Sequence, residues 1–287
     1  ITKKLKLEKI KIKAPAKLNL FLRVLRKRKD NYHDIRSGVT LINLFDEIEI
    51  MKHHSTTVSY IGEFSPKEGF YKDCIIKKTL KYLNVENNFK IKVIIKKNIP
   101  VQGGLGSAST NAAALIIALD KLNLVKIRSD YKYYSLLGAD IPIFLFKQNC
   151  IVTGLGEKIY KQQYPKYFFL LIKPKIDFST RKMYELLSKK NYFSLESVEN
   201  NKINMINEDD NGNDFEKIAI EESLKIKEIL EHISNLDNCI FSRMTGTGSC
   251  CYAAFENLEF AKEAKIQFNK FFPDLWAVIV ENNMYNV

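Results

Sequence analysis

The segment Ile99–Leu122 (IPVQGGLGSASTNAAALIIALDKL) places a loop of small residues directly before a long apolar run. Three of the 12 glycines of the chain lie in this loop, at Gly103, Gly104 and Gly106. Glycine permits backbone conformations that other residues avoid and lets a ligand approach the main chain closely. The first turn of a following helix presents unpaired N–H groups and the positive end of the helix dipole. The segment therefore predicts a phosphate-binding loop, with a tight turn before an ordinary capped helix as the alternative.

Two common phosphate loops do not match this segment. No lysine follows the glycines, which excludes the G-x-x-x-x-G-K-[ST] pattern. The G-x-G-x-x-G pattern, with an acidic residue about 20 positions further on, is also absent. A phosphate loop of another kind is needed.

Composition narrows the class of protein without deciding its function. The chain has 287 residues, of which 46% are hydrophobic, enough for a sizeable core in one large or two ordinary domains. No apolar run approaches the roughly 18 residues of a membrane span. The net charge of +12 is spread along the chain, so an anionic small substrate fits it as well as nucleic acid does.

The amino-terminal sequence leaves the compartment open. It is basic and alternating, without the apolar stretch of a signal peptide, and the chain begins with Ile. We expect a cytoplasmic bacterial protein, or one in a plastid-like organelle if a leader has been removed. The five cysteines lack C-x-x-C spacing and predict buried, reduced thiols. The four histidines lack zinc-ligand spacing, so no structural metal is expected.

Hydrophobic periodicity predicts a mixed α+β architecture. Strands are predicted at Lys9–Lys13, Leu18–Leu25, Glu47–Met51, Phe89–Lys96, Tyr167–Ile172, Cys250–Phe255 and Trp276–Val280. Helices are predicted at Cys74–Leu83, Ser107–Leu122, Phe215–His232 and Glu259–Phe271. A short apolar stretch follows Gly138, and the polar segment Lys189–Gly212 predicts a surface loop. A boundary between two halves is expected between Gly156 and Tyr167.

Three motifs, in order along the chain, resemble those of the GHMP small-molecule kinases. They are APAKLNLFL at Ala14–Leu22, PVQGGLGSAST at Pro100–Thr110 and MTGTGSCCYAAF at Met244–Phe255. The resemblance implies a two-domain α+β fold with the active site in the cleft between the domains. The amino-terminal, ATP-binding domain is expected at residues 1–160 and the carboxyl-terminal, substrate-side domain at 161–287.

Further segments are similar to one branch of that family. They are NYHDIRS at Asn31–Ser37, LGADIPIFL at Leu137–Leu145, GLGEKI at Gly154–Ile159 and NDFE at Asn213–Glu216. The branch phosphorylates a hydroxyl of a cytidine-diphosphate-linked polyol in non-mevalonate isoprenoid synthesis, with ATP and Mg²⁺. This implies a small-molecule substrate with a cytidine diphosphate group, no nucleic acid or membrane partner, and a monomer or homodimer. The alternatives are a homoserine or mevalonate type of GHMP kinase and, more remotely, a basic nucleic-acid-binding protein.

The resemblance assigns the catalytic roles to Asp140 and Lys17. Asp140, in LGADIP, matches the carboxylate that takes the proton of the attacking hydroxyl or orients that hydroxyl. Lys17, in PAKLNL, matches the lysine that keeps this carboxylate ionised and polarises the hydroxyl. On the residues alone, a turn-capping role would be favoured for Asp140 and a solvated surface position for Lys17.

The resemblance places ATP on the glycine loop. The residues expected to bind it are Lys97, Pro100, Gly103, Gly104, Leu105, Gly106, Ser107, Ala108, Ser109 and Thr110. Mg²⁺ is expected on the ATP phosphates, with a hydroxyl of Ser107, Ser109 or Thr110 in contact. Ala108 has no hydroxyl and takes no metal role. Adenine is expected near Cys74–Ile75 and Lys97, although the family tends to have Asn where Cys74 stands.

The cytidine part of the substrate needs an aromatic face and directional hydrogen bonds. Tyr32 and His33 can supply both, and Tyr184 resembles a second aromatic that sandwiches the base. The other residues expected at the substrate are Asn19, Thr180, Gly246, Thr247 and Gly248. Taken singly, each aromatic is equally compatible with core packing, and the GTGS segment with a plain hairpin turn.

Overall fold

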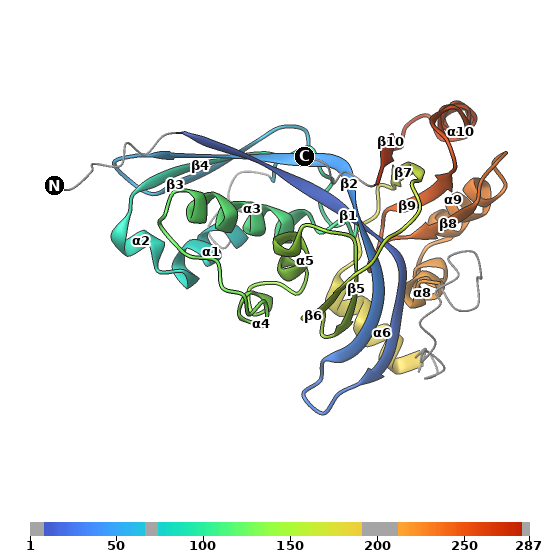
Figure 1. Ribbon diagram of the computed structural model, residues 1–287. Helices are drawn as coiled ribbons and strands as arrows, with labels where there is room; N and C mark the ends of the chain where they lie inside the picture. The colour runs from blue at the N-terminus through green and yellow to red at the C-terminus, as the bar shows by residue number, and fades with distance from the viewer. Residues whose placement is uncertain (1–8, 67–73, 191–211, 283–287) are drawn as a thin grey trace. The chain divides into compact units, whose positions relative to one another are not determined.

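A computed structural model describes residues 9–66, 74–190 and 212–282 of the chain (Figure 1). It divides into two compact units, each made of several segments. The first unit contains Ile1–Ala16, Leu44–Pro100 and Gly106–Lys147. The second contains Lys17–Asn43, Val101–Leu105 and Gln148–Val287. No helix in the part of the chain that the structure describes is long and apolar enough to cross a membrane.

Two long paired strands, β1 (Ile10–Lys27) and β2 (His33–Lys52), contribute residues to both units. In the first unit the end of β2 pairs antiparallel with β4 (Ile91–Lys96), with Glu47 opposite Lys96. Strand β4 also pairs parallel with β3 (Thr57–Ile61).

The helices of the first unit are α1 (Ile75–Tyr82), α2 (Val85–Asn88), α3 (Ser107–Lys121), α4 (Lys132–Ser135) and α5 (Ile141–Phe146). Helices α1 and α3 lie along one face of β3 and β4 (Figure 1). The side chains of Ile91, Val93 and Ile95 alternate along β4 and are fully buried against these helices. Helix α3 is buried from Thr110 to Leu119 because small and apolar residues occupy nearly all of its sides there.

In the second unit the beginning of β2 pairs with β5 (Cys150–Gly154), and β5 pairs with β6 (Lys158–Lys161). A separate antiparallel sheet has the order β10-β7-β9-β8. Its strands are β7 (Phe168–Lys173), β8 (Phe241–Met244), β9 (Cys251–Phe255) and β10 (Trp276–Glu281). The helices are α6 (Thr180–Lys190), α8 (Asp214–Glu222), α9 (Leu224–Ser234) and α10 (Leu258–Phe271).

The core of the second unit joins these helices to the four-stranded sheet and to β1. Phe215 of α8, Ile229 of α9 and Phe268 of α10 are fully buried in it, together with Leu170 of β7. Each such side chain contributes about 1.5–3 kcal/mol through removal from water. The core therefore fixes both ends of the β8–β9 connection, residues 245–250.

The predicted α+β mixture is confirmed, but several boundaries differ. The two predicted amino-terminal strands form one strand, β1, and Glu47–Met51 is the end of the 20-residue β2. The predicted helix Phe215–His232 is wrong in its continuity: it is two helices, α8 and α9, separated at Ser223. The Ser223 hydroxyl accepts a hydrogen bond from the Ile226 N–H and caps α9, which favours an interruption over a continuous helix.

Seven elements were missed, namely β3, β5, β6, β8, α2, α4 and α6. All but α6 have five residues or fewer, too short for a clear hydrophobic period. The predicted loop Lys189–Gly212 begins two residues too early, since α6 extends to Lys190. Residues 191–211 lie outside the described part of the chain. The predicted domain boundary at 160/161 stays a prediction; the second compact unit takes residues from both sides of it.

All five cysteines are free thiols. Cys150, Cys250 and Cys251 are buried, and Cys74 and Cys239 are half-buried. Burial raises the pKa of the Cys250 thiol to about 12, which keeps it protonated and unreactive at neutral pH.

Candidate functional site

Lys97 lies in the first unit with its ammonium group buried. Its side chain is 3% exposed and donates hydrogen bonds to the carboxylate of Asp46 and to the hydroxyl of Ser107. The other oxygen of Asp46 accepts the N–H groups of Asn98 and Ile99, at 2.7 and 2.8 Å. Burial lowers the pKa of Lys97, and the Asp46 carboxylate opposes that shift. The Lys97 ammonium therefore connects Asp46 to Ser107, the first residue of helix α3.

Asp46 is a site residue that sequence reasoning missed. It follows Phe45 within a strand and belongs to no recognisable motif. The available signal for this site was an acidic residue inside an apolar strand, in a chain rich in lysine. A buried carboxylate of this kind requires a partner charge and hydrogen-bond donors, and Asp46 has both.

The amino terminus of α3 has the features of an anion site. Gly106, the N-cap residue, has φ 72°, and its carbonyl accepts the first helical hydrogen bond from the Thr110 N–H at 2.9 Å. The N–H groups ahead of Thr110 have no acceptor within the helix. In the described part of the chain, the buried Thr110 Oγ1 and Asn111 Oδ1 have no hydrogen-bond partner. The Thr110 hydroxyl is a donor beside a helix amino terminus and fits a bound phosphate group, whereas the Asn111 Oδ1 can only accept.

Asp140 lies at the start of α5, also in the first unit. The residue is half-buried, and its side chain does not cap the helix. A Cβ placed on Gly138 would lie 3.2 Å from the Ser109 Oγ, so the LGADIP turn is close to the first turn of α3. The Asp140 side chain makes no capping hydrogen bond to α5, and its catalytic role stays a prediction.

Lys17 lies in the second unit and is 3% exposed, so it is not a solvated surface charge. Its ammonium donates to the side-chain oxygen of Asn19. Its backbone N–H donates to the carbonyl of Leu105 at 3.1 Å, which joins β1 to the glycine loop. A lysine that is buried this deeply needs hydrogen-bond partners for its ammonium, and Asn19 is one of them.

Asn19 is held by four further hydrogen bonds. Its N–H donates to the Thr245 Oγ1 at 3.0 Å, and the Thr245 hydroxyl reaches back to the Asn19 Oδ1 at 3.3 Å. Its side-chain amide donates to the Ser37 Oγ at 2.7 Å, and its carbonyl accepts the Tyr252 hydroxyl at 2.9 Å. The Oδ1 that faces Lys17 is thereby fixed in direction. Ser37, Thr245 and Tyr252 were not predicted as site residues.

The glycine loop packs against the 245–250 connection within the second unit. The N–H of Cys250 donates to the Gly103 carbonyl at 3.2 Å, and the N–H of Ser249 donates to the Gln102 carbonyl at 3.3 Å. Gly104 has φ +75°, and a Cβ there would overlap the carbonyl oxygen of Thr245. Gly104 is therefore needed both for its backbone conformation and for this close approach. The structure thus brings together two segments that the resemblance had assigned to one site.

Asn213 connects the same loop to helix α8. Its side-chain amide donates to the carbonyls of Met244 and Gly246, at 2.7 and 2.8 Å. Its Oδ1 accepts the Phe215 N–H at 3.0 Å and caps α8. Glu216 accepts the Met244 N–H at 2.7 Å. The NDFE motif, which had no assigned role, therefore fixes residues 244–246 through hydrogen bonds to their backbone.

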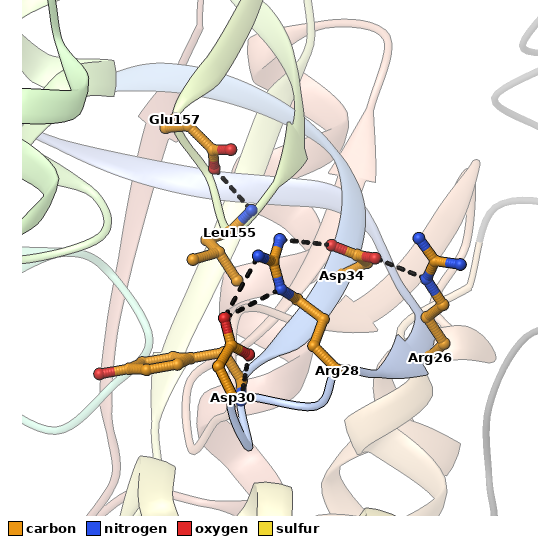
Figure 2. A network of polar contacts seen from close by, with 7 residues as sticks. Arg26, Arg28, Asp30, Asp34, Leu155 and Glu157 are labelled. Carbon is orange, nitrogen blue, oxygen red and sulfur yellow. Dashed lines mark hydrogen bonds and ion pairs between the residues drawn. The ribbon is translucent and has the colours of Figure 1, made fainter.

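Tyr32 lies on the turn between β1 and β2, and His33 is the first residue of β2. Figure 2 shows the ion pairs of this turn, in which Asp34 contacts Arg26 at 2.7 Å and Arg28 at 3.2 Å. The hydrogen bond from Arg26 lowers the pKa of Asp34, which keeps the carboxylate charged. Exposed pairs of this kind stabilise little individually, but together they order the turn. Tyr32 is 64% exposed and open to a ligand.

The remaining predicted substrate residues lie in the second unit. His33 and Tyr184 stack directly, with ring centroids 4.8 Å apart, and Tyr184 contacts Phe215 edge-on at 4.7 Å. The hydroxyls of Thr180 and Thr247 are 3.1 Å apart. Cys74, at the expected adenine region of the first unit, precedes α1 without capping it.

The predicted residues therefore fall into two groups. The first unit contains Lys97, Pro100, Gly106, Ser107, Ala108, Ser109, Thr110 and Asp140. The second contains Lys17, Asn19, Tyr32, His33, Gly103, Gly104, Leu105, Thr180, Tyr184, Gly246, Thr247 and Gly248. The two catalytic candidates, Asp140 and Lys17, belong to different units.

Comparison with known proteins identifies the family. The model of the GHMP kinases N terminal domain matches residues 73–148, and that of the GHMP kinases C terminal matches residues 194–274. The 4-diphosphocytidyl-2-C-methyl-D-erythritol kinase of Syntrophus aciditrophicus is 32% identical over 94% of this chain and 97% of its own length. The chain belongs to the 4-diphosphocytidyl-2-C-methyl-D-erythritol kinase branch of the GHMP kinases. The family resemblance of the motifs is confirmed.

Further relatives and solved structures support the same family. The enzyme of the same name from Buchnera aphidicola is 31% identical over 87% of this chain and 88% of its own length. A solved 4-(cytidine 5'-diphospho)-2C-methyl-D-erythritol kinase has the same fold, with a TM-score of 0.76 at 21% identity, covering 96% of this chain and all of that chain. The Methanococcus jannaschii mevalonate kinase shares the fold at a TM-score of 0.63 and 18% identity, over 96% of this chain and 99% of its own. The protein is thus a small-molecule kinase with the GHMP fold, and ATP is its phosphate donor.

Proposed function

We propose that this kinase transfers the γ-phosphoryl group of ATP to the 2-hydroxyl of 4-diphosphocytidyl-2-C-methyl-D-erythritol. The products are the 2-phosphate and ADP, in the non-mevalonate route to isoprenoid precursors. The relatives named for this substrate, each matched over most of its length, support the assignment. The structural observation that carries it is the buried residue Lys17, whose ammonium is held by Asn19 and whose backbone N–H donates to the glycine loop at Leu105.

The ATP phosphates are proposed to lie on the amino terminus of α3 and the adjacent glycines. The N–H groups of the first helical turn and the Thr110 hydroxyl have unused hydrogen-bonding capacity that phosphate oxygens can satisfy. The Lys97 ammonium is directed to Asp46 and Ser107, so its proposed role is to orient the start of the helix. The adenine ring of ATP is proposed to bind near Cys74–Ile75 and Lys97.

Mg²⁺ is proposed as the metal, held through the ATP phosphates with Ser109 or Ser107 nearby. The described residues include no group of three His, Cys, Asp or Glu side chains that could hold a metal alone. A metal ion that is bound mainly by the phosphate oxygens of the nucleotide needs no such group of protein ligands. Bound there, it would neutralise the charge that develops on the phosphoryl oxygens.

Asp140 and Lys17 are proposed to act on the reacting hydroxyl. Asp140 accepts its proton, or orients it, from the turn beside Ser109. Lys17 supplies positive charge that favours the ionised carboxylate and the negative charge of the transition state. Asn19 fixes the direction of the ammonium. Phosphoryl transfer depends mainly on such positioning and charge compensation.

The cytosine ring is proposed to lie against Tyr32 and the edge of the His33–Tyr184 pair. His33 and Tyr184 contact each other, so the base does not lie between these two rings as arranged. Tyr32 is exposed on the adjoining turn and supplies the other aromatic face. Thr180, Thr247 and the glycines of the 246–248 turn are proposed to contact the remainder of the substrate.

The experiment that tests this function measures ADP release with Mg²⁺-ATP and the cytidyl substrate, beside mevalonate, homoserine and no acceptor. Turnover is expected only with the cytidyl substrate. Asp140→Asn is expected to lower kcat by about 10²–10⁴-fold. Asp130→Asn, whose side chain accepts the Lys132 N–H on the surface, is the matched control and should retain activity. Turnover with another acceptor, or full activity of the Asp140 variant, would contradict the assignment.

A further inference from the structure

Ser188, on helix α6, contacts the candidate cytosine-binding residue His33. The Ser188 Oγ lies 2.9 Å from the His33 Nε2. The same oxygen lies 2.9 Å from the carbonyl oxygen of Tyr184, one helical turn earlier, to which it donates. All three residues belong to the second unit. No motif includes Ser188, and the proposed reaction gives it no role.

The two contacts of the Ser188 oxygen constrain the direction of the His33–Ser188 hydrogen bond. A serine hydroxyl has one hydrogen, and the Tyr184 carbonyl can only accept. Both contacts are hydrogen bonds at once only when Ser188 donates to Tyr184 and accepts from a hydrogen on the His33 Nε2 atom. In a neutral imidazole with a hydrogen on Nε2, the Nδ1 atom carries the lone pair and is an acceptor.

The surroundings of His33 favour this neutral form. Burial lowers its pKa, and the nearby positive charge of Lys27 lowers it further. At neutral pH the ring is therefore uncharged, and its hydrogen-bonding character depends on the tautomer. The tautomer is the property that Ser188 controls.

The ring plane is fixed as well as the tautomer. His33 stacks on Tyr184 with an interplanar angle of 28° and a centroid separation of 4.8 Å. Tyr184 in turn packs edge-on against the buried ring of Phe215. A histidine held by a stack on one face and a hydrogen bond at Nε2 cannot rotate to exchange its two nitrogens without losing the Ser188 contact.

We infer that Ser188 is a positioning and specificity-determining residue that makes His33 Nδ1 an acceptor for the 4-amino group of cytosine. Cytosine has an N–H₂ donor at this position, whereas uracil has a carbonyl acceptor. An acceptor facing an acceptor gains no hydrogen bond and is repelled, so uridine analogues bind more weakly. The inference rests on the proposed function, because it assumes that His33 faces the nucleobase of the substrate.

Two measurements on the full chain test it, neither of which requires turnover. The first is the ¹⁵N chemical shifts of the His33 side chain, which distinguish the two neutral tautomers directly. The second is the affinity of the protein for CDP and for UDP, measured by calorimetry. The variants are Ser188→Ala, which removes the acceptor, and Ser188→Thr, which keeps a hydroxyl. Lys189→Ala, an exposed neighbour on the same helix, is the matched control.

The wild type and Lys189→Ala are expected to have the hydrogen on Nε2 and to prefer CDP. In Ser188→Ala the tautomers should mix and the CDP-to-UDP preference should fall about tenfold, the value of one net hydrogen bond. Ser188→Thr should restore both properties. In turnover assays Ser188→Ala should raise KM for the cytidyl substrate and leave kcat unchanged.

A wild-type spectrum with the hydrogen on Nδ1 would overturn the inference. An unchanged CDP-to-UDP preference in a folded Ser188→Ala protein would also overturn it. A different result would contradict the proposed function itself. If folded wild-type protein binds neither CDP nor UDP, the cytidine assignment is wrong. The His33 spectrum would still show whether Ser188 sets the tautomer.

Discussion

Replacing Gly103 by alanine should introduce a clash that one specific second substitution relieves. A Cβ at position 103 would lie 2.5 Å from the Sγ of Cys250 and 3.7 Å from its Cβ. The first distance is a severe overlap, and the second is an ordinary van der Waals contact. Overpacking of this kind costs about 1–3 kcal/mol of unfolding free energy. Cys250→Ala removes the Sγ, and alone it should cost about 1 kcal/mol through the small cavity it leaves.

The double variant should therefore be more stable than the sum of its parts predicts. With both substitutions, the new methyl group occupies space that the sulfur has vacated. We expect the combined loss to be smaller than the sum of the two single losses by about 1–2 kcal/mol. This coupling is the quantity that the geometry predicts.

Gly104→Ala is the matched control. Its Cβ would overlap the backbone carbonyl oxygen of Thr245, and its φ is +75°. The left-handed conformation alone costs an alanine about 1 kcal/mol, and shortening a side chain does not relieve an overlap with the backbone. Gly104→Ala should therefore destabilise the protein, and Cys250→Ala should not rescue it.

Urea unfolding followed by tryptophan fluorescence is the suitable assay. The chain has one tryptophan, Trp276, which lies on β10 in the same unit as the three substituted positions. ADP release by the same variants shows whether the strained loop also loses activity. Additive losses for Gly103→Ala and Cys250→Ala, within about 0.5 kcal/mol, would refute the packing argument.

Three further substitutions test contacts that organise the two units. Asp46→Asn should cost about 3–5 kcal/mol because it leaves the buried Lys97 ammonium without its counter-charge; a much smaller loss by circular dichroism would contradict the buried pair. Asn213→Asp should cost about 2–3 kcal/mol by facing two carbonyl oxygens with a carboxylate, measured by Trp276 fluorescence. Burial lowers the pKa of His232 in the folded protein. As the pH drops below about 6.5, the imidazole is therefore protonated more readily in the unfolded chain than in the folded one, and the free energy of unfolding should fall. His232→Leu should reduce that fall between pH 7.5 and 5.5, and an equal fall in the variant would exclude His232 as its source.

Much of the local structure follows from the sequence because its causes are local. The alternation of Ile91, Val93 and Ile95 with less buried neighbours predicts β4. The apolar run after the glycine loop predicts α3, which begins at Ser107 as expected. The short strands β5 and β6 carry no such period, and Ser223 interrupts what reads as a single amphipathic helix.

The candidate site is only partly readable in the same way. The motifs around Lys17, Asp140 and the glycine loop predict where the chemistry takes place, and the family they indicate is confirmed. Their supporting residues carry no local signal. Asp46 is 51 positions from Lys97, and Ser188 is 155 positions from His33.

The sequence by itself determined the family, the glycine loop before α3 and most of the strands and helices, because small residues, turns and hydrophobic periods act over a few neighbouring positions. Only the tertiary structure decided that Lys97 is turned onto Asp46 and Ser107, that Asn213 clamps the 244–246 segment, and that Ser188 meets His33. These contacts depend on strand pairing and on which helix packs over which strand. That arrangement is set by the burial of apolar surface throughout each unit.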